Sequence, residues 1–323
     1  MNKVIFYEAF DEEASAIRKF LPGDLNAVFT WKTIQEQGDS SPPAELISVR
    51  TQSRVPKEWG KRIKGILTRS RGYDHLTAFR RETGLDIPCG FLDDYCGRAA
   101  AEQAVLMMMA LLRKLKKQAG NFRAFSRDGI TGAQCKGRRA FVAGVGHIGA
   151  EIVDITKGLR MEVKGFDIEH KIKGLVYVPL AEGIAWADVV FCALPLTEAT
   201  RGMIGYEALK QGSPGKIFVN VARGEISPAG ELKRLLEEGA VGGIGLDVFP
   251  EESALAHRLR AGTESSNQEV KTVLELAERD EALFTPHNAF NTQEALEQKA
   301  ALSAQAVKQF LARGTFPLAV PSL

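Results

Sequence analysis

Gly144-Val145-Gly146-His147-Ile148-Gly149 is the most informative stretch of this chain. It follows an apolar run at residues 140–143 and precedes a helical stretch at residues 150–159. Between a strand and a helix, the first glycine permits a tight bend and the second lets the backbone approach a pyrophosphate. The third glycine allows the helix to pack closely on the strand. The helix N-terminus then offers free N–H groups to the phosphates. The stretch therefore predicts a dinucleotide-binding turn.

An acidic residue stands where such a turn needs one. Asp167 closes the next predicted strand, residues 162–166, and lies 18 residues after Gly149. A carboxylate there accepts hydrogen bonds from both ribose hydroxyls of the adenosine and repels a 2′-phosphate. No arginine follows Asp167, so the sequence favours NAD over NADP, although Lys164 and Lys171 lie nearby in the chain. The alternative interpretation is an incidental glycine turn beside a solvated acid.

The same alternation of strand and helix extends in both directions from the turn. Predicted strands lie at residues 4–7, 28–30, 46–49, 66–68, 140–143, 162–166, 189–194, 217–220, 243–247 and 282–285. Predicted helices lie at residues 12–20, 76–82, 99–117, 150–159, 269–278 and 292–312. Alternating β and α elements with near-continuous apolar strands are typical of parallel sheets covered on both faces. The chain is therefore expected to be an α/β protein with two doubly wound parallel-sheet domains.

Composition excludes several classes of protein. The 323 residues carry 42 Lys and Arg against 40 Asp and Glu, so no excess of charge predicts a nucleic-acid or membrane partner. The longest apolar run, residues 104–112, is about half of a membrane span. Cys89, Cys96, Cys135 and Cys192 form no CxxC pair, so neither a structural zinc site nor a thioredoxin motif is indicated. Scattered thiols and a start without a signal peptide predict a cytoplasmic location.

Three further segments follow predicted strands of the second series. They read VNVARG at residues 219–224, GLDVFPEE at residues 245–252 and TPHNA at residues 285–289. Open α/β sheets bind their ligands at the carboxyl ends of the strands. In this order after the glycine turn, the segments resemble those of the D-isomer-specific 2-hydroxyacid dehydrogenase family, and the resemblance covers essentially the whole chain.

The residues in these segments suit the reduction of a 2-keto acid. A cation must hold the carboxylate and polarise the ketone, and Arg223 can do so through fork-like hydrogen bonds. NADH supplies the hydride. His287 can supply the proton because histidine titrates near neutral pH. Glu252 can pair with His287 and favour the imidazolium. The family usually has proline after this glutamate, whereas Ser253 follows Glu252 here, so Glu251 competes for the role. The spacing from Asp247 favours Glu252.

The resemblance also implies a domain organisation and a set of binding residues. It implies a Rossmann NAD-binding domain, residues 101–290, inserted in a flavodoxin-like substrate domain, residues 1–100 plus 291–323. It implies the roles above for Arg223, Glu252 and His287, and it places Asp247 near the nicotinamide. The implied cofactor-binding residues are Gly144, Gly146, His147, Ile148, Gly149, Asp167, Leu194, Pro195, Thr200, Val221, Ala222, Asp247 and Ala289. The backbone N–H groups of Ser70, Arg71 and Gly72 match the family's loop that grips the substrate carboxylate.

Two features resemble the D-lactate and D-2-hydroxyisocaproate dehydrogenase branch of that family. A long insertion separates Glu252 from His287, and residues 287–292 match that branch's H-x-A-F-x-T pattern. Tyr95 falls where the branch places a tyrosine that contacts substrate, so Tyr95 and Phe290 are expected to line an aromatic pocket. The chain departs from the branch at residues 96–98, Cys-Gly-Arg instead of Ser-Pro. Cys96 and Arg98 either face the substrate or pack at the helix start.

Several functions remain open at this level. The leading interpretation is an NAD-dependent D-2-hydroxyacid dehydrogenase that acts on a small 2-keto or 2-hydroxy acid. Hydroxypyruvate reductase or a phosphoglycerate dehydrogenase-like enzyme is the alternative with the same chemistry. An NAD(H)-sensing corepressor is the alternative of another class, because such proteins keep the same residues. The resemblance also implies a homodimer with the predicted helix at residues 99–117 in its interface.

Overall fold

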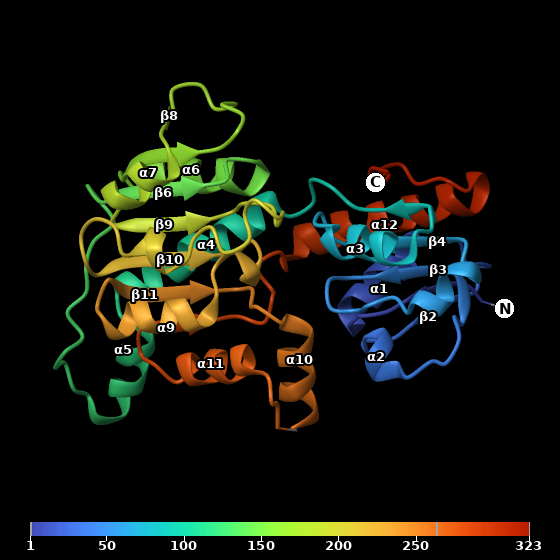
Figure 1. The fold of residues 1–323 in the computed structure, drawn as a ribbon, viewed down its shortest axis with the longest axis horizontal. Helices are drawn as coiled ribbons and strands as arrows, with labels where there is room; N and C mark the ends of the chain where they lie inside the picture. Colours follow the sequence, from blue (N-terminus) through green and yellow to red (C-terminus); the bar gives the residue numbers. More distant parts are fainter. Residues whose placement is uncertain (1, 263, 323) are drawn as a thin grey trace. The chain divides into compact units, whose positions relative to one another are not determined.

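The computed structural model of the chain describes residues 2–262 and 264–322 (Figure 1). The chain forms two compact units. Unit 1 comprises the described parts of Met1–Tyr95 and Thr292–Leu323, and unit 2 comprises Cys96–Asn291. Every pairing of neighbouring strands in the described residues is parallel. The predicted class, two doubly wound parallel-sheet domains, is confirmed.

Unit 1 contains a five-stranded sheet in the order β2-β1-β3-β4-β5. This is the order of flavodoxin-like sheets. In such sheets the strands are added first on one side of β1 and then on the other, and this order reverses between β1 and β3. The strands are β1 (Asn2–Phe6), β2 (Ala27–Phe29), β3 (Ala44–Val49), β4 (Gly65–Thr68) and β5 (Cys89–Gly90). The helices are α1 (Asp11–Phe20), α2 (Ile34–Gln37), the 3-10 turn η1 (Lys57–Lys61), α3 (Asp74–Thr83) and α12 (Gln293–Arg313).

Helix α12 returns the end of the chain to unit 1. The hydroxyl of Thr292 accepts the N–H of Ala295 and so caps the helix start, and Gly314 ends the helix in the left-handed conformation. The helix packs along α1. The helix predicted at residues 292–312 is therefore confirmed, and it completes the core of a sheet whose strands all come from the first 95 residues.

Unit 2 contains a seven-stranded sheet in the order β12-β11-β10-β9-β6-β7-β8. The direction across the sheet reverses between β6 and β9, where doubly wound sheets bind their ligands. The strands are β6 (Arg139–Ala143), β7 (Glu162–Phe166), β8 (Val176–Tyr177), β9 (Val189–Cys192), β10 (Lys216–Asn220), β11 (Val241–Leu246) and β12 (Ala282–Phe284).

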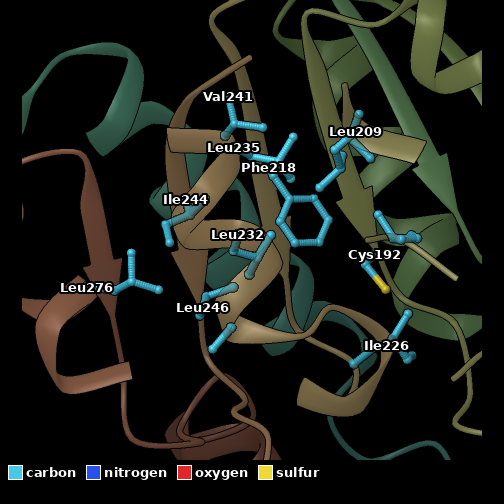
Figure 2. Close-up of a cluster of buried hydrophobic side chains, with 14 of the residues drawn as sticks. Cys192, Leu209, Phe218, Ile226, Leu232, Leu235, Val241, Ile244, Leu246 and Leu276 are labelled. Carbon is cyan, nitrogen blue, oxygen red and sulfur yellow. The ribbon is translucent and has the colours of Figure 1, made fainter. Parts of the chain in front are cut away.

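The helices of unit 2 cover its sheet. They are α4 (Gly97–Leu112), α5 (Leu115–Asn121), η2 (Phe122–Ala124), α6 (His147–Gly158), α7 (Leu180–Trp186), α8 (Tyr206–Leu209), η3 (Gly224–Ile226), α9 (Ala229–Glu237), α10 (Glu252–Ala261) and α11 (Gln268–Ala277). Figure 2 shows one core cluster, in which Phe218 of β10 and Ile244 of β11 lie near Leu232 and Leu235 of α9. All four are fully buried, and each such side chain contributes about 2 kcal/mol to folding.

One helix prediction is wrong. A single helix was expected over residues 99–117, but α4 ends at Leu112 and α5 begins at Leu115. Lys114 between them adopts the left-handed conformation, with φ 52°. Beyond the break, the ammonium of Lys116 donates to the carbonyl oxygens of Ala277, which ends α11, and of Arg279 after it. The chain turns to make contacts that the local sequence does not encode.

The predicted strands agree with the structure to within two residues at either end. Strands β5 and β8 have two residues each and were not predicted, because so short a segment shows no periodicity. Among the described residues, no helix combines the length and the apolar character that crossing a membrane requires.

Candidate active site

The glycine turn of unit 2 is built from β6 and the start of α6. Gly144 has φ 89°, and a Cβ there would lie 2.6 Å from the carbonyl carbon of Ala193. A Cβ on Gly149 would lie 1.9 Å from the carbonyl oxygen of Gly144. Both positions therefore require glycine for the fold itself, because any side chain would collide with backbone.

Gly146 requires another explanation. Its φ is −78°, which other residues adopt, and a Cβ there would meet no atom within 4 Å. Nothing in the protein itself thus excludes a side chain at this exposed position, just before the first N–H groups of α6. The space that a Cβ would fill is where a pyrophosphate would approach these N–H groups. The turn therefore fits a dinucleotide, with His147 and Ile148 able to contribute backbone N–H groups.

Asp167 lies at the end of β7, beside this turn. Its Oδ2 accepts the N–H of Val145 at 2.6 Å, and its Oδ1 accepts the N–H of Glu169 at 3.0 Å. The half-buried carboxylate is thereby held at the turn. The two lysines nearby in sequence are engaged with acids, Lys164 with Glu182 and Lys171 with Glu169.

The remaining predicted cofactor residues lie at the ends of β9, β10 and β12. Thr200 is nearly buried, and its hydroxyl donates to the carbonyl oxygen of Pro195 at 2.6 Å. Thr200 therefore shapes the loop that Leu194 and Pro195 begin. The other members, Val221, Ala222 and Ala289, are buried. The structure thus places the residues predicted to bind the cofactor along the carboxyl edge of one sheet.

His287 and Glu252 meet at the same edge. The distance between His287 Nδ1 and Glu252 Oε1 is 2.7 Å, and their side chains are 17% and 18% exposed. Glu252 is the first residue of α10, and Glu251 before it adopts a left-handed conformation with φ 52°. Glu252, and not Glu251, therefore contacts the histidine. His287 also has a positive φ, 51°, a conformation that costs on the order of 1 kcal/mol and is often kept at functional sites.

Asp247 fixes the segment that carries His287. It is 1% exposed, and its carboxylate accepts the hydroxyl of Thr285 at 2.5 Å and the N–H groups of Asn288 and Ala289 at 2.8 and 2.9 Å. Its carbonyl oxygen accepts the N–H of His287 at 2.9 Å. Burial raises the pKa of Asp247, and the neighbouring imidazole and these hydrogen bonds oppose the rise. Asp247 thus orders the turn around His287.

Arg223 lies on a turn after β10 that Asn220 organises. The Asn220 side chain accepts the N–H of Ala222 at 2.9 Å and donates to the carbonyl oxygen of Arg223 at 2.9 Å. The guanidinium of Arg223 donates to the carbonyl oxygen of Ala222 at 2.8 Å and is half-buried. The next position requires glycine, because a Cβ on Gly224 would lie 1.9 Å from the backbone of Phe249.

Unit 1 carries the predicted carboxylate loop at the end of β4. Ser70 Oγ lies 2.7 Å from Thr68 Oγ1 and donates to the carbonyl oxygen of Gly72 at 2.8 Å. Within the described residues, the N–H groups of Ser70, Arg71 and Gly72 donate no hydrogen bond. Tyr95 is 8% exposed, and its hydroxyl donates to the carbonyl oxygen of Arg69 at 3.4 Å.

The expected pocket around the substrate side chain stays a prediction. Tyr95 belongs to unit 1, whereas Phe290, half-buried, belongs to unit 2. Cys96 is the N-cap residue of α4 and Arg98 pairs with Glu102 at 2.6 Å and with Glu151 of α6 at 3.2 Å. Of the two interpretations of these residues, this arrangement supports packing at the helix start.

Sequence reasoning missed the residues that hold the catalytic candidates. Asn220, Thr285 and Asn288 take part in the hydrogen bonds described above. Asn220 stands at the end of a strand and two residues before a turn, where asparagine commonly bonds its own backbone, and this signal could have identified it. Thr285 and Asn288 carry no comparable signal, because their partner Asp247 is about 40 residues away in the chain.

Comparison with known proteins agrees with this geometry. Residues 105–289 match the family model described as D-isomer specific 2-hydroxyacid dehydrogenase, NAD binding domain. A 2-hydroxyacid dehydrogenase A of Aspergillus oryzae is 30% identical over 78% of this chain and 73% of its own length. A D-lactate dehydrogenase of Lactiplantibacillus plantarum is 30% identical over 78% of this chain and 76% of its own length.

A solved structure is similar over nearly the whole chain. The D-lactate dehydrogenase from Aquifex aeolicus, complexed with NAD and lactic acid, is 27% identical with a TM-score of 0.85 and covers 99% of this chain and 100% of its own. The glycine turn, the His287–Glu252 pair and these similarities agree. The chain belongs to the D-isomer-specific 2-hydroxyacid dehydrogenase family, on its D-lactate dehydrogenase branch, and is an NAD-dependent oxidoreductase.

Proposed function

We propose that this chain reduces a small 2-keto acid to the D-2-hydroxy acid with NADH, and catalyses the reverse reaction. The observation that carries the proposal is the 2.7 Å contact of His287 with Glu252, at the sheet edge that also bears the glycine turn. An acid–base pair and a dinucleotide turn on one edge are the two parts that a proton-coupled hydride transfer needs.

Each polar residue has a distinct task. NADH, when bound, supplies the hydride. Arg223 binds the substrate carboxylate and polarises the ketone, because its planar guanidinium donates two parallel hydrogen bonds. His287 holds the proton for the nascent alkoxide at Nε2, since Nδ1 faces Glu252. The family resemblance assigns the N–H groups of Ser70–Gly72 to the substrate carboxylate, and Tyr95 and Phe290 to the substrate side chain. We also propose that the boundaries between the two domains lie near residues 100 and 290.

The substrate is proposed as a short 2-keto acid such as pyruvate. Similar proteins include the D-lactate dehydrogenase of Lactiplantibacillus plantarum and a glyoxylate reductase of Pyrococcus furiosus, which is 29% identical over 88% of this chain. Both names describe reactions of short 2-hydroxy or 2-oxo acids. Asp167 at the glycine turn, with Lys164 and Lys171 paired to other acids, supports NADH over NADPH.

The deciding experiment follows the loss of NADH absorbance with the purified protein. The panel runs from glyoxylate, pyruvate and hydroxypyruvate through branched and aromatic 2-keto acids to oxaloacetate and 2-ketoglutarate, with NADPH in parallel. We expect turnover of a short acid with NADH and a kcat/KM at least about tenfold lower with NADPH. Tight NADH binding without turnover of any acid would contradict the proposal and favour the sensor alternative.

The role of Glu252 predicts a change in pH dependence. A carboxylate in contact with an imidazole stabilises its charged form. Glu252→Gln should therefore shift the falling, alkaline limb of ketoacid reduction to lower pH and reduce kcat at pH 8, measured as kcat against pH. Glu251→Gln is the matched control and should leave the profile unchanged. Equal profiles for the wild type and Glu252→Gln would refute the pairing.

The assembly and location are also proposals. Apolar side chains are exposed along α4, α5 and η2 of unit 2: Leu106 by 55%, Met109 by 40%, Leu115 by 52% and Phe122 by 74%. A surface of this kind supports a homodimer through unit 2. All four cysteines are free thiols, which supports the cytoplasm as the location.

A further inference from the structure

A cluster of buried charges lies directly before the Ser70–Gly72 loop of unit 1. Arg69 is the residue preceding that loop, and its side chain is 0% exposed. Its guanidinium donates to three elements: to Glu13 Oε1 of α1 at 2.9 Å, to Ser48 Oγ of β3 at 3.0 Å, and to the carbonyl oxygen of Tyr7 after β1 at 2.7 Å. Arg69 is therefore fixed against most of the width of the sheet.

Glu13 also binds a second buried cation. Lys299 of α12 lies 2.7 Å from the same Oε1 of Glu13, and its side chain is 0% exposed. Burial would raise the pKa of Glu13, but the charges of Arg69, Lys299 and Arg50 hold it well below its usual range. Burial lowers the pKa of Lys299 to about 7, aided by Arg50 and Arg69 and opposed by Glu13. One carboxylate thus lies among three cations.

Stability alone does not account for such a cluster. Taking charges out of water costs several kcal/mol per ion. A protein in which apolar side chains of similar volume replace the buried ions is often as stable or more stable. A buried ionic arrangement is therefore weak evidence for a stabilising role. It does, however, define one geometry, because Glu13, Ser48 and the carbonyl oxygen of Tyr7 all lose a hydrogen bond if Arg69 moves.

The backbone around Arg69 continues this arrangement into the loop. The carbonyl oxygen of Arg69 accepts the hydroxyl of Tyr95, and the carbonyl oxygen of Ser70 accepts the N–H of Leu92 at 3.2 Å. Both the side chain and the carbonyl oxygen of Arg69 are thus held by hydrogen bonds, directly before Ser70. The position of the N–H groups of Ser70–Gly72 therefore depends on the position of Arg69.

We propose that Glu13 and Lys299 are positioning residues for the substrate-carboxylate loop: Lys299 holds Glu13, and Glu13 holds the guanidinium of Arg69, the residue before Ser70–Gly72. The inference rests on the proposed function, because it assigns the loop to the substrate carboxylate. Misplacement of a binding group by about 1 Å can reduce activity about a hundredfold, so an anchor outside the site can set the affinity.

The test compares anchor variants with matched controls in the full-length protein. Lys299→Met and Glu13→Gln break the cluster, and Ser48→Ala removes a single acceptor of Arg69, so it keeps the test valid if the larger changes prevent folding. Lys64→Met is the control for lysine, because Lys64 pairs with Glu45 on the surface. Arg80→Lys is the control for a general loss of packing, because Arg80 is a buried arginine bound to backbone carbonyls in the same unit.

Two measurements separate positioning from folding. The first is steady-state kinetics, in which the anchor variants should raise KM for the 2-keto acid about fivefold or more while Kd for NADH stays constant. The second is amide hydrogen exchange, in which the peptide that contains Ser70–Gly72 should exchange faster in the anchor variants. The peptide that contains Gly144–Gly149 should not change, and neither control should show the pair of effects.

The outcomes are distinct. Unchanged KM and unchanged exchange in Ser48→Ala and in the larger variants would overturn the inference. So would an equal effect of Arg80→Lys, because it would show a general loss of structure. If the wild type turns over no 2-keto acid, the proposed function fails, and exchange at Ser70–Gly72 still decides whether the cluster positions the loop.

Discussion

Glycine is needed for different reasons at Gly146 and Gly149. At Gly149 the requirement is internal, because a Cβ would lie 1.9 Å from the carbonyl oxygen of Gly144. At Gly146 it is external, because the position is open and its φ is ordinary. Gly149 therefore serves the fold, and Gly146 is proposed to serve the cofactor that binds at the turn.

This difference predicts opposite consequences for two similar variants. Gly149→Ala should lower the free energy of unfolding by about 2 kcal/mol or more through overpacking. Gly146→Ala should leave stability within about 0.5 kcal/mol of the wild type, and should weaken NADH binding about tenfold by obstructing the pyrophosphate. Denaturant melts and fluorescence titration with NADH measure the two effects. Unimpaired NADH binding by Gly146→Ala would count against the assigned position of the pyrophosphate.

At this scale, the sequence identifies residues that have a chemical motif and misses those that support them. Arg223, Glu252 and His287 stand in recognisable segments, and the structure brings Glu252 and His287 into contact. The turn-forming role of Asp247 was not predicted, because its partners Thr285 and Asn288 follow a long insertion and meet it only in the folded chain.

At the scale of elements, helices α1 and α12 share a buried charge cluster, in which burial lowers the pKa of Lys299 to about 7. Lys299 of α12 faces Glu13 of α1, Arg69 after β4 and Arg50 after β3. Lys299 has a pKa of about 7 in the folded protein, whereas an unfolded chain keeps the lysine proton to a pH of about 10. Between these values the unfolded state binds more protons, so stability rises with pH.

The expected result is a difference between the wild type and Lys299→Met. Relative to the variant, the free energy of unfolding of the wild type should increase from pH 7 to pH 9, measured by urea denaturation at each pH. Lys64→Met should follow the wild type, since Lys64 is exposed. Parallel pH curves for the wild type and Lys299→Met would show that Lys299 keeps its proton in the folded protein.

Element prediction failed where tertiary contacts decide the conformation. Residues 99–117 contain neither glycine nor proline, and no local signal marks a break at Lys114. The break accompanies a tertiary contact, the hydrogen bonds of Lys116 to the carbonyl oxygens of Ala277 and Arg279. The long helix α12 was predictable because its cap, its periodicity and its terminal glycine all lie in its own sequence.

At the scale of the whole molecule, the proposed homodimer makes a prediction about association. Leu106→Asp should produce a monomer by light scattering after gel filtration, because a carboxylate would be buried without a partner. Leu259→Asp is the matched control, since Leu259 of α10 is 62% exposed in another part of unit 2. A dimer that survives Leu106→Asp, or a wild type that is monomeric at micromolar concentration, would refute the interface.

The two units differ in whether their residues are synthesised as one continuous stretch. Unit 2 is one uninterrupted stretch, Cys96–Asn291, whereas unit 1 needs both ends of the chain. Lys299 reaches the core of unit 1 from α12, and Arg80 donates to the carbonyl oxygens of Val320 and Pro321 near the last residues. Domains generally fold as units during synthesis. Unit 2 can therefore fold on the nascent chain, whereas the sheet of unit 1 lacks the cover of α12 until residues 293–313 have been synthesised.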